Sequence, residues 1–165
     1  MRELTKIERA RYFAIASHGS QKYGTNTLPY YYHLEEVYGV LEEFGWTEED
    51  VLIGGLLHDI LEDCPVSYND IKEEFGERVA EFVYSVTDEL GRNRKERKDK
   101  TYPKIVRSLE AVAIKLADRI ANIRNAGMKN MYTKEHPEFK KALYYPHHTD
   151  ERIKRMWREI EELIL

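Results

Sequence analysis

Apolar residues recur every three or four positions along most of the chain, and residues that favour turns interrupt the pattern at intervals. This spacing is typical of amphipathic helices with one face toward a core. No segment combines strict apolar–polar alternation with the turn residues of a hairpin. The pattern therefore predicts an all-α fold, a single compact bundle of about seven to nine helices.

Capping residues and glycines set the expected helix boundaries. Thr5, with Glu8 three residues later, forms a capping box, and Gly45 is placed to end the second helix. The expected helices cover about residues 5–20, 34–44, 47–63 (opened by Thr47 with Asp50), 68–75 (capped by Ser67), 77–87, 103–125 and a final helix capped by Thr149. The final helix carries one apolar stripe, formed by Ile153, Met156, Trp157, Ile160 and Leu163.

One polar stretch stands apart from this pattern. Residues 91–100 hold six basic and two acidic side chains and show poor periodicity, which favours a solvated loop. We expect one domain over residues 1–165, with the polar motifs described below in about 5–125 and a C-terminal helical extension over about 136–165.

Composition narrows the classes of function. The 165 residues carry 26 Lys+Arg against 30 Asp+Glu, a net charge of −4, which argues against a nucleic-acid binder that relies on overall charge. A single cysteine, Cys64, excludes an internal disulfide framework. The run Val51–Leu57 is too short to span a bilayer, and the first residues lack an apolar signal core. These features lead us to expect a cytoplasmic protein without a membrane partner.

Polar residues inside apolar helices are the most informative feature. His58 and Asp59 directly follow a buried-looking run, and Glu62 and Asp63 lie four residues after them. On a helix, residues four apart project on nearly one side. Burying such groups without partners costs several kcal/mol. A divalent cation relieves this cost, because it takes imidazole and carboxylate groups as ligands.

Two other places repeat this anomaly. Asp118 lies in the apolar run AVAIKLADRIANIRN with Asn122 one turn later, and His33 ends the segment PYYYH. Each residue alone has an ordinary structural interpretation, as a cap, a salt-bridge partner or a solvated group. Together they form a more specific pattern, in which 25 positions separate His33 from His58 and 59 separate Asp59 from Asp118.

The sequence resembles the HD superfamily of metal-dependent phosphohydrolases, and within it the hydrolase domain of RelA/SpoT-type enzymes and the small stand-alone alarmone hydrolases. The matching stretches are A-x-x-x-H with Gln21 after it, PYYYH, LLHDILED, FGERVAEFVYSVTDE and IKLADRIANIR, over about residues 10–125. The resemblance implies one divalent metal ion, usually manganese. Its implied ligands are His33, His58, Asp59 and Asp118.

The same resemblance implies roles for further residues. Glu62 and Asp63 would position and deprotonate the attacking water, or protonate the leaving oxygen. The implied substrate contacts are Lys22, Tyr23, Tyr30, Lys95, Lys98, Asn122 and Asn125. Among these, Asn122 corresponds to a ribose or nucleotide contact, while Lys95 and Lys98 are candidates to hold diphosphate oxygens.

The segment after Gln21 departs from the family pattern. Relatives carry an Arg-Lys pair there, whereas this chain has Lys22 and then Tyr23, which is able to stack on a base in place of arginine. The leading hypothesis is a (p)ppGpp 3′-pyrophosphohydrolase. The alternatives are an HD-type phosphatase acting on another nucleotide, such as NADPH or a 5′-nucleotide, and a catalytically silent nucleotide-binding domain. Each implies a small-molecule nucleotide partner and leaves the oligomeric state open.

Overall fold

The structure is a computed structural model that describes residues 1–24, 27–125, 127–145 and 148–165. Within these ranges it contains no β-strand beyond one isolated bridge between Lys22 and Pro29, which confirms the predicted all-α class. The helices are α1 Lys6–His18, α2 Tyr31–Glu43, α3 Glu49–Leu57, α4 Ile60–Asp63, α5 Tyr68–Phe75, α6 Glu77–Val86, α7 Arg94–Ile105, α8 Leu109–Asn125, α9 Lys129–Leu143 and α10 Glu151–Ile164. Of these, α4 is a single turn of 4 residues.

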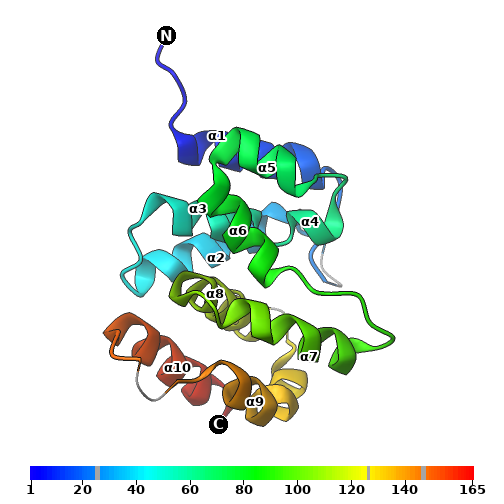
Figure 1. Ribbon diagram of the computed structural model, residues 1–165, viewed down its shortest axis with the longest axis vertical. Coiled ribbons are helices and arrows are strands. Elements are labelled where there is room, and N and C mark those ends of the chain that lie inside the picture. The colour runs from blue at the N-terminus through cyan, green and yellow to red at the C-terminus, as the bar shows by residue number, and fades with distance from the viewer. Residues whose placement is uncertain (25–26, 126, 146–147) are drawn as a thin grey trace.

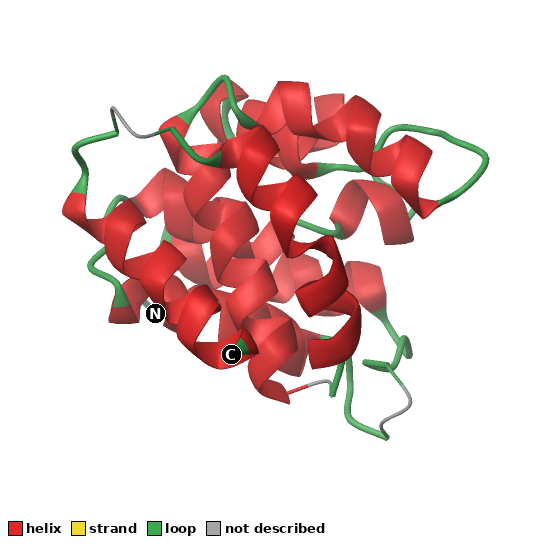
Figure 2. Cartoon of the chain, turned by 90° about the horizontal axis from the view of Figure 1, so that it is seen from below, coloured by secondary structure: helices red, strands yellow, loops and turns green. Residues whose placement is uncertain are grey.

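Helix α8 runs through the middle of the bundle. Figure 1 shows α1 and α5 at one end, α9 and α10 at the other, and α2, α3, α6 and α8 between them. Figure 2 shows the same helices from below, joined by loops at the edge of the bundle. One apolar cluster joins α8 to α2 and α10, and a second lies among α1, α3, α5 and α6. Among the described residues, no helix is both long and apolar enough to cross a lipid bilayer.

Several predicted boundaries are confirmed. The Thr5 and Ser67 side chains each form a capping box, at the start of α1 and of α5. The predicted stripe of α10 is buried at Ile153, Met156, Trp157 and Ile160. Two predicted caps are wrong. Helix α3 begins after Glu48 instead of Thr47, and the cap of α10 is Asp150 instead of Thr149, because the Asp150 carboxylate accepts from the amides of Arg152 and Ile153.

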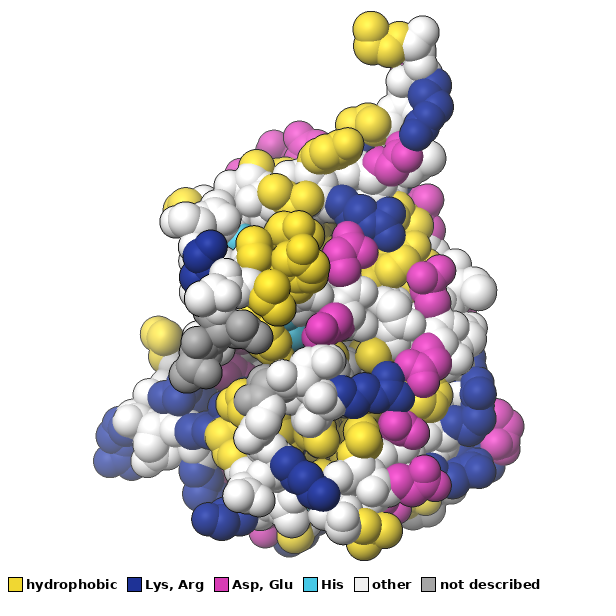
Figure 3. All heavy atoms as spheres, turned by 180° about the vertical axis from the view of Figure 1, so that it is seen from behind, with side chains coloured by type: hydrophobic (Ala, Val, Ile, Leu, Met, Phe, Trp, Pro, Cys, Tyr) yellow, Lys and Arg dark blue, Asp and Glu magenta, His cyan; other side chains and the backbone are white. Residues whose placement is uncertain are grey.

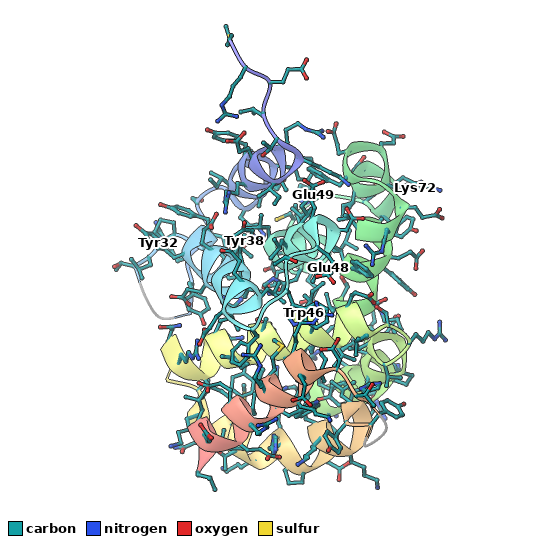
Figure 4. The ribbon with its side chains drawn as sticks, turned by 90° about the vertical axis from the view of Figure 1, so that its left-hand side faces the viewer. Tyr32, Tyr38, Trp46, Glu48, Glu49 and Lys72 are labelled. Carbon is teal, nitrogen blue, oxygen red and sulfur yellow. The ribbon has the colours of Figure 1, made fainter. Side chains whose placement is uncertain are left out.

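The C-terminal segment packs against the rest of the bundle. Arg152 of α10 lies 3.7 Å from the ring centroid of Trp46 and 3.1 Å from the Glu48 carboxylate. Trp46 and Glu48 are labelled in Figure 4. Trp46 is only 1% exposed. Acidic and basic side chains are both spread over the face shown in Figure 3, so this face does not present the single-sign surface of a nucleic-acid binder.

The helix predicted over 47–63 is interrupted. It ends at Leu57, and α4 begins at Ile60 after Asp59 adopts φ −101° and ψ 0°. The Gly55 carbonyl, which an unbroken helix pairs with the Asp59 amide, lies 2.7 Å from His58 Nδ1. The break places His58 and Asp59 at the junction of α3 and α4, and Glu62 and Asp63 in α4.

The predicted loop over 91–100 is wrong, because most of this segment forms α7. The Asn93 side chain caps the helix by accepting from the Glu96 amide. Ion pairs four residues apart support the exposed side, including the pair between Lys95 and Asp99. The helix continues through Pro103 to Ile105, and α8 begins only at Leu109, so the single helix predicted over 103–125 is also wrong at its start.

Candidate active site

The four residues proposed as metal ligands converge from separate elements. His33 lies in the first turn of α2, His58 and Asp59 lie at the break between α3 and α4, and Asp118 lies in α8. His33 Nε2 is 3.0 Å and His58 Nε2 is 3.3 Å from Asp118 Oδ1. Asp59 Oδ2 is 2.9 Å from His58 Nε2. Suitable ligand atoms of His33, His58 and Asp118 all lie within 4.8 Å of one another.

Hydrogen bonds orient these groups from behind. His58 Nδ1 lies 2.7 Å from the Gly55 carbonyl, which can only accept, so Nδ1 carries a proton and Nε2 is the nitrogen that faces the cluster. The Tyr30 hydroxyl donates to Asp59 Oδ2, and Asn122 Nδ2 donates to Asp118 Oδ1 at 3.0 Å. Two imidazoles and two carboxylates oriented in this way fit a divalent transition-metal ion.

The electrostatics of the cluster also fit a bound cation. Burial opposes the charged form of Asp118, but neighbouring His58 and Lys115 outweigh it and hold the pKa of Asp118 well below its usual value. Burial likewise opposes the charged form of His58, but Asp59 and Asp118 raise its pKa well above the usual value. The site therefore keeps its carboxylates ionised and favours positive charge at its centre.

The cluster lines a cavity of about 210 Å³. Six acidic or histidine side chains that line it are termed the metal-binding wall, and four basic side chains are termed the basic wall. The first group is His33, His58, Asp59, Glu62, Asp88 and Asp118, and the second is Arg94, Lys98, Lys115 and Arg119. The two groups are in contact, because Lys98 pairs with Asp88 and Lys115 with Asp118. A metal site with basic side chains in the same cavity suits an anionic ligand.

Glu62 and Asp63 occupy different positions despite being adjacent in sequence. Glu62 lines the cavity, and its Oε1 accepts from the Asp88 amide at 2.5 Å. Burial of the carboxylate and the nearby charge of Asp59 raise the pKa of Glu62 above its usual value. Asp63 is not among the lining residues; its Oδ2 accepts from Gln21 Nε2 at 3.1 Å.

Three of the seven predicted substrate contacts line the cavity, namely Tyr30, Lys98 and Asn122. Tyr23 is 9% exposed, and its ring stacks on His33 with centroids 4.7 Å apart, so it offers no free face for a base. Its hydroxyl lies 2.5 Å from Asn122 Oδ1.

The other three predicted contacts lie outside the cavity lining. Lys22 is exposed, in the isolated bridge with Pro29. Lys95 pairs with Asp99 at 2.7 Å on the outer side of α7. Asn125 donates to Glu36 at 2.9 Å. Thr25, which belongs to the altered segment after Gln21, lies outside the described residues.

Sequence reasoning missed much of the basic wall. Arg94 and the buried Arg119 both contact Glu135 of α9, and Arg119 lies 3.7 Å from the ring centroid of Phe139. Tyr132 of α9 also lines the cavity. Arg119 carried a usable signal, because it interrupts the same apolar run as Asp118. Tyr132 and Glu135 carried none, since only the packing of α9 brings them to the site.

The predicted lysine on this wall is held by an ion pair. Lys98 Nζ lies 2.8 and 2.9 Å from the two carboxylate oxygens of Asp88, and the residue is 8% exposed. Burial and the nearby positive charge of Lys115 lower the pKa of Lys98 to about 8, although Asp88 opposes the change. Lys98 is therefore a cation whose charge is sensitive to pH just above neutrality.

Comparison with known proteins agrees with this geometry. The HD-domain family model matches residues 10–144, so the chain belongs to the HD-domain family. Over 124 residues it is 39% identical to a guanosine-3′,5′-bis(diphosphate) 3′-pyrophosphohydrolase of Aquifex aeolicus, covering 72% of this chain and 17% of that protein. Over 121 residues it is 33% identical to a Drosophila melanogaster protein of the same name, MESH1, covering 72% of this chain and 68% of that one.

The chain thus spans only a fraction of its long bacterial relatives. The bifunctional (p)ppGpp synthase/hydrolase SpoT of Escherichia coli is 33% identical over 132 residues, which cover 76% of this chain and 18% of that protein. A solved structure described as a metazoan ortholog of SpoT that hydrolyzes ppGpp superposes with a TM-score of 0.81 at 24% identity. That superposition covers 100% of this chain and 99% of the other, so the two share the fold along their full length.

Proposed function

We propose that this chain is a metal-dependent phosphohydrolase that removes the 3′-diphosphate of (p)ppGpp. The observation that carries the proposal is the convergence of His33, His58 and Asp118 in a cavity that four basic side chains also line. The names of the matched relatives support the substrate. The products are pyrophosphate and GDP or GTP, because water contributes its hydroxyl to the diphosphate and its remaining proton to the ribose 3′ oxygen.

The proposed cofactor is a divalent ion, Mn²⁺, held by His33, His58, Asp59 and Asp118. When bound, such an ion lowers the pKa of a water ligand and neutralises phosphate charge. The donor set supports a borderline-to-hard divalent ion with positions left for water and a phosphate oxygen.

The protein side chains perform the remaining tasks in this proposal. Lys98 and Arg94 line the basic wall, where they are placed to bind phosphate oxygens. Glu62 is placed to take a proton from the attacking water, since its raised pKa makes it a better base than an ordinary carboxylate. Asn122 holds Asp118 in place and also lines the cavity, where it is available to the ribose.

A turnover assay on ppGpp tests the proposal. Products are separated by ion exchange, with and without Mn²⁺, and NADPH, GTP, dATP and AMP are assayed beside it. We expect pyrophosphate and GDP to appear only with metal, and the Asp59→Ala variant to lose this activity. Release of pyrophosphate at full rate by that variant would contradict the proposed site.

A second candidate keeps the chemistry and changes the nucleotide. The supporting observation is Tyr23, which occupies the region where relatives carry a basic pair and which stacks on His33 instead of standing free. Preferential turnover of NADPH or a 5′-nucleotide over ppGpp in the same panel would favour this candidate. Tight binding of ppGpp without turnover would instead favour a silent nucleotide-binding domain.

A further inference from the structure

His18, the last residue of α1, contacts Tyr30 and Gln21. These two residues donate hydrogen bonds to the carboxylates of Asp59 and Asp63. His18 is 6% exposed, and its ring stacks on Tyr30 with centroids 4.9 Å apart and an interplanar angle of 29°. Its Nδ1 lies 2.9 Å from Gln21 Oε1. Its Nε2 is buried and has no hydrogen-bond partner among the described residues. Buried polar atoms are usually hydrogen-bonded, so a buried histidine with one unpaired ring nitrogen is unlike an ordinary packing residue.

One connection runs from His18 through Gln21 to Asp63. Gln21 Nε2 donates to Asp63 Oδ2 at 3.1 Å. An ionised carboxylate only accepts hydrogen bonds, so the amide nitrogen of Gln21 faces Asp63 and its oxygen faces His18. His18 Nδ1 must therefore carry the proton and donate to Gln21 Oε1. In this way His18 fixes which end of the amide reaches the carboxylate.

The backbone holds Gln21 at this position. Its amide donates to the His18 carbonyl at 3.1 Å, and its carbonyl accepts from the Tyr30 amide at 2.9 Å. The two bonds tie the segment after α1 to the segment before α2. The backbone of Gln21 is therefore held beside both His18 and Tyr30, within reach of Asp63.

The second connection runs from His18 through Tyr30 to Asp59. The Tyr30 hydroxyl donates to Asp59 Oδ2, and the His18 ring covers one face of the tyrosine. A tyrosine hydroxyl keeps its proton at neutral pH. Tyr30 is therefore a hydrogen-bond donor, and its ring position affects where the Asp59 carboxylate points.

We propose that His18 is a positioning residue that orients Asp59 through Tyr30 and Asp63 through Gln21. The effect through Asp63 rests on the proposed function and on the role that the family resemblance implies for Asp63, while the effect on Asp59 concerns metal binding alone. His18 is neither one of the grouped ligand residues nor a lining residue of the cavity, so it acts only through these two residues. Partners that orient ligands in this way commonly change metal affinity or activity by about 10- to 100-fold.

Two substitutions at His18 separate the two connections. His18→Phe keeps an aromatic ring against Tyr30 and removes the donor to Gln21. His18→Asn keeps an amide donor near the place of Nδ1 and removes the ring. We expect His18→Phe to lower kcat by about 10-fold with the Mn²⁺ dissociation constant changed by less than about 2-fold. We expect His18→Asn to weaken Mn²⁺ binding by about 10-fold, measured by titration calorimetry.

Variants along each connection provide the matching comparison. Gln21→Ala should reproduce the kcat loss of His18→Phe, and Tyr30→Phe should reproduce the metal defect of His18→Asn. The matched control is Tyr68→Phe, which removes a tyrosine hydroxyl that donates to Glu81 at 2.5 Å outside the site. This control should change neither quantity. Urea unfolding of every variant shows whether a loss of kcat or of Mn²⁺ affinity is explained by a loss of stability.

The outcomes decide between positioning and packing. The proposal is overturned if both His18 variants lose kcat and metal affinity equally and in proportion to their loss of stability. It is also overturned if both variants keep the wild-type kcat and metal affinity. If the wild-type protein turns over no nucleotide in the panel, the proposed function fails. The calorimetric comparison of His18→Asn with Tyr30→Phe then still confirms or refutes the connection to Asp59.

Discussion

The two walls of the cavity are built in different ways. The metal-binding wall comes from α2, α8 and the break between α3 and α4, and its histidines His33 and His58 are 1% and 3% exposed. The basic wall takes Lys115 and Arg119 from α8 and its other two residues from α7, where Lys98 pairs with Asp88 and Arg94 pairs with Glu135 of α9. The first wall is fixed by apolar helix packing, and the second by ion pairs between elements. Changes to the first should abolish chemistry, and changes to the second should alter substrate affinity.

The largest effect is expected at Asp118. Asp118→Asn keeps the shape of the side chain and removes the charge that faces both histidines at 3.0 and 3.3 Å. Loss of one charge-stabilising group in an active site typically lowers kcat by about 100- to 1,000-fold. We expect a loss at the upper end of that range, together with loss of Mn²⁺ binding by calorimetry. Retained Mn²⁺ affinity in a folded variant would show that Asp118 is not a ligand.

The same contrast explains what the sequence could predict. Asp59 and Asp118 were identifiable because a carboxylate inside an apolar helix has few alternatives to a partner or an ion. The helix α7 was not identifiable, since the residues it buries include Lys98, Thr101 and Lys104, which leave no apolar period. Glu135 and Tyr132 reach the site only through the packing of α9, which no local pattern records. The break at His58 was also hidden, because it follows from a side-chain bond to Gly55.

The second-largest effect is expected at Lys98. Lys98→Met removes the charge-assisted hydrogen bonds available to a phosphate and should raise KM by about 30-fold while kcat changes less. Steady-state kinetics on the substrate identified by the panel measures this. The matched control is Lys104→Met, a second buried lysine of α7 that bonds the carbonyls of Tyr84 and Thr87 outside the cavity lining. It should lower stability without a comparable rise in KM. A similar rise in both variants would assign the effect to the folding of α7.

The titration of Lys98 sharpens the comparison further. Its pKa of about 8 means that the ammonium is protonated at pH 7 and loses its proton as the pH rises through 8. A bound phosphate favours the protonated form, so affinity should fall on the alkaline side, by up to about 8-fold between pH 7.5 and 9. Binding of ppGpp without added metal, measured by calorimetry across this range, tests it. Lys98→Arg should remove this dependence, because a guanidinium stays protonated; an unchanged alkaline loss would contradict the assignment.

A smaller effect is expected at Gly91, which places the start of α7. A Cβ at this position would lie 2.9 Å from the Arg97 backbone nitrogen and 3.0 Å from Arg97 Cγ. Gly91→Ala should therefore displace the first turn of α7, which carries Arg94, and raise KM by about 3-fold with a stability loss of about 1–3 kcal/mol. Gly39→Ala in α2 is the matched control, because nothing lies within 4 Å of its added Cβ. The free energy of unfolding of that control, measured in urea, should rise or stay unchanged. A decrease equal to that of Gly91→Ala would contradict the explanation by a close contact at Gly91.

The smallest effect is expected at Lys95, which tests whether position or charge alone makes the basic wall. Lys95 and Lys98 lie on the same helix, but Lys95 is exposed and pairs with Asp99, whereas Lys98 lines the cavity. Lys95→Ala should therefore change KM by less than about 2-fold, because exposed charges are screened by solvent and salt. Kinetics at 50 mM and 300 mM salt measure the difference between Lys95→Ala and Lys98→Ala. If both variants raise KM equally and salt abolishes both effects, α7 attracts the substrate by its overall charge. The position of Lys98 in the cavity would then give it no advantage over Lys95.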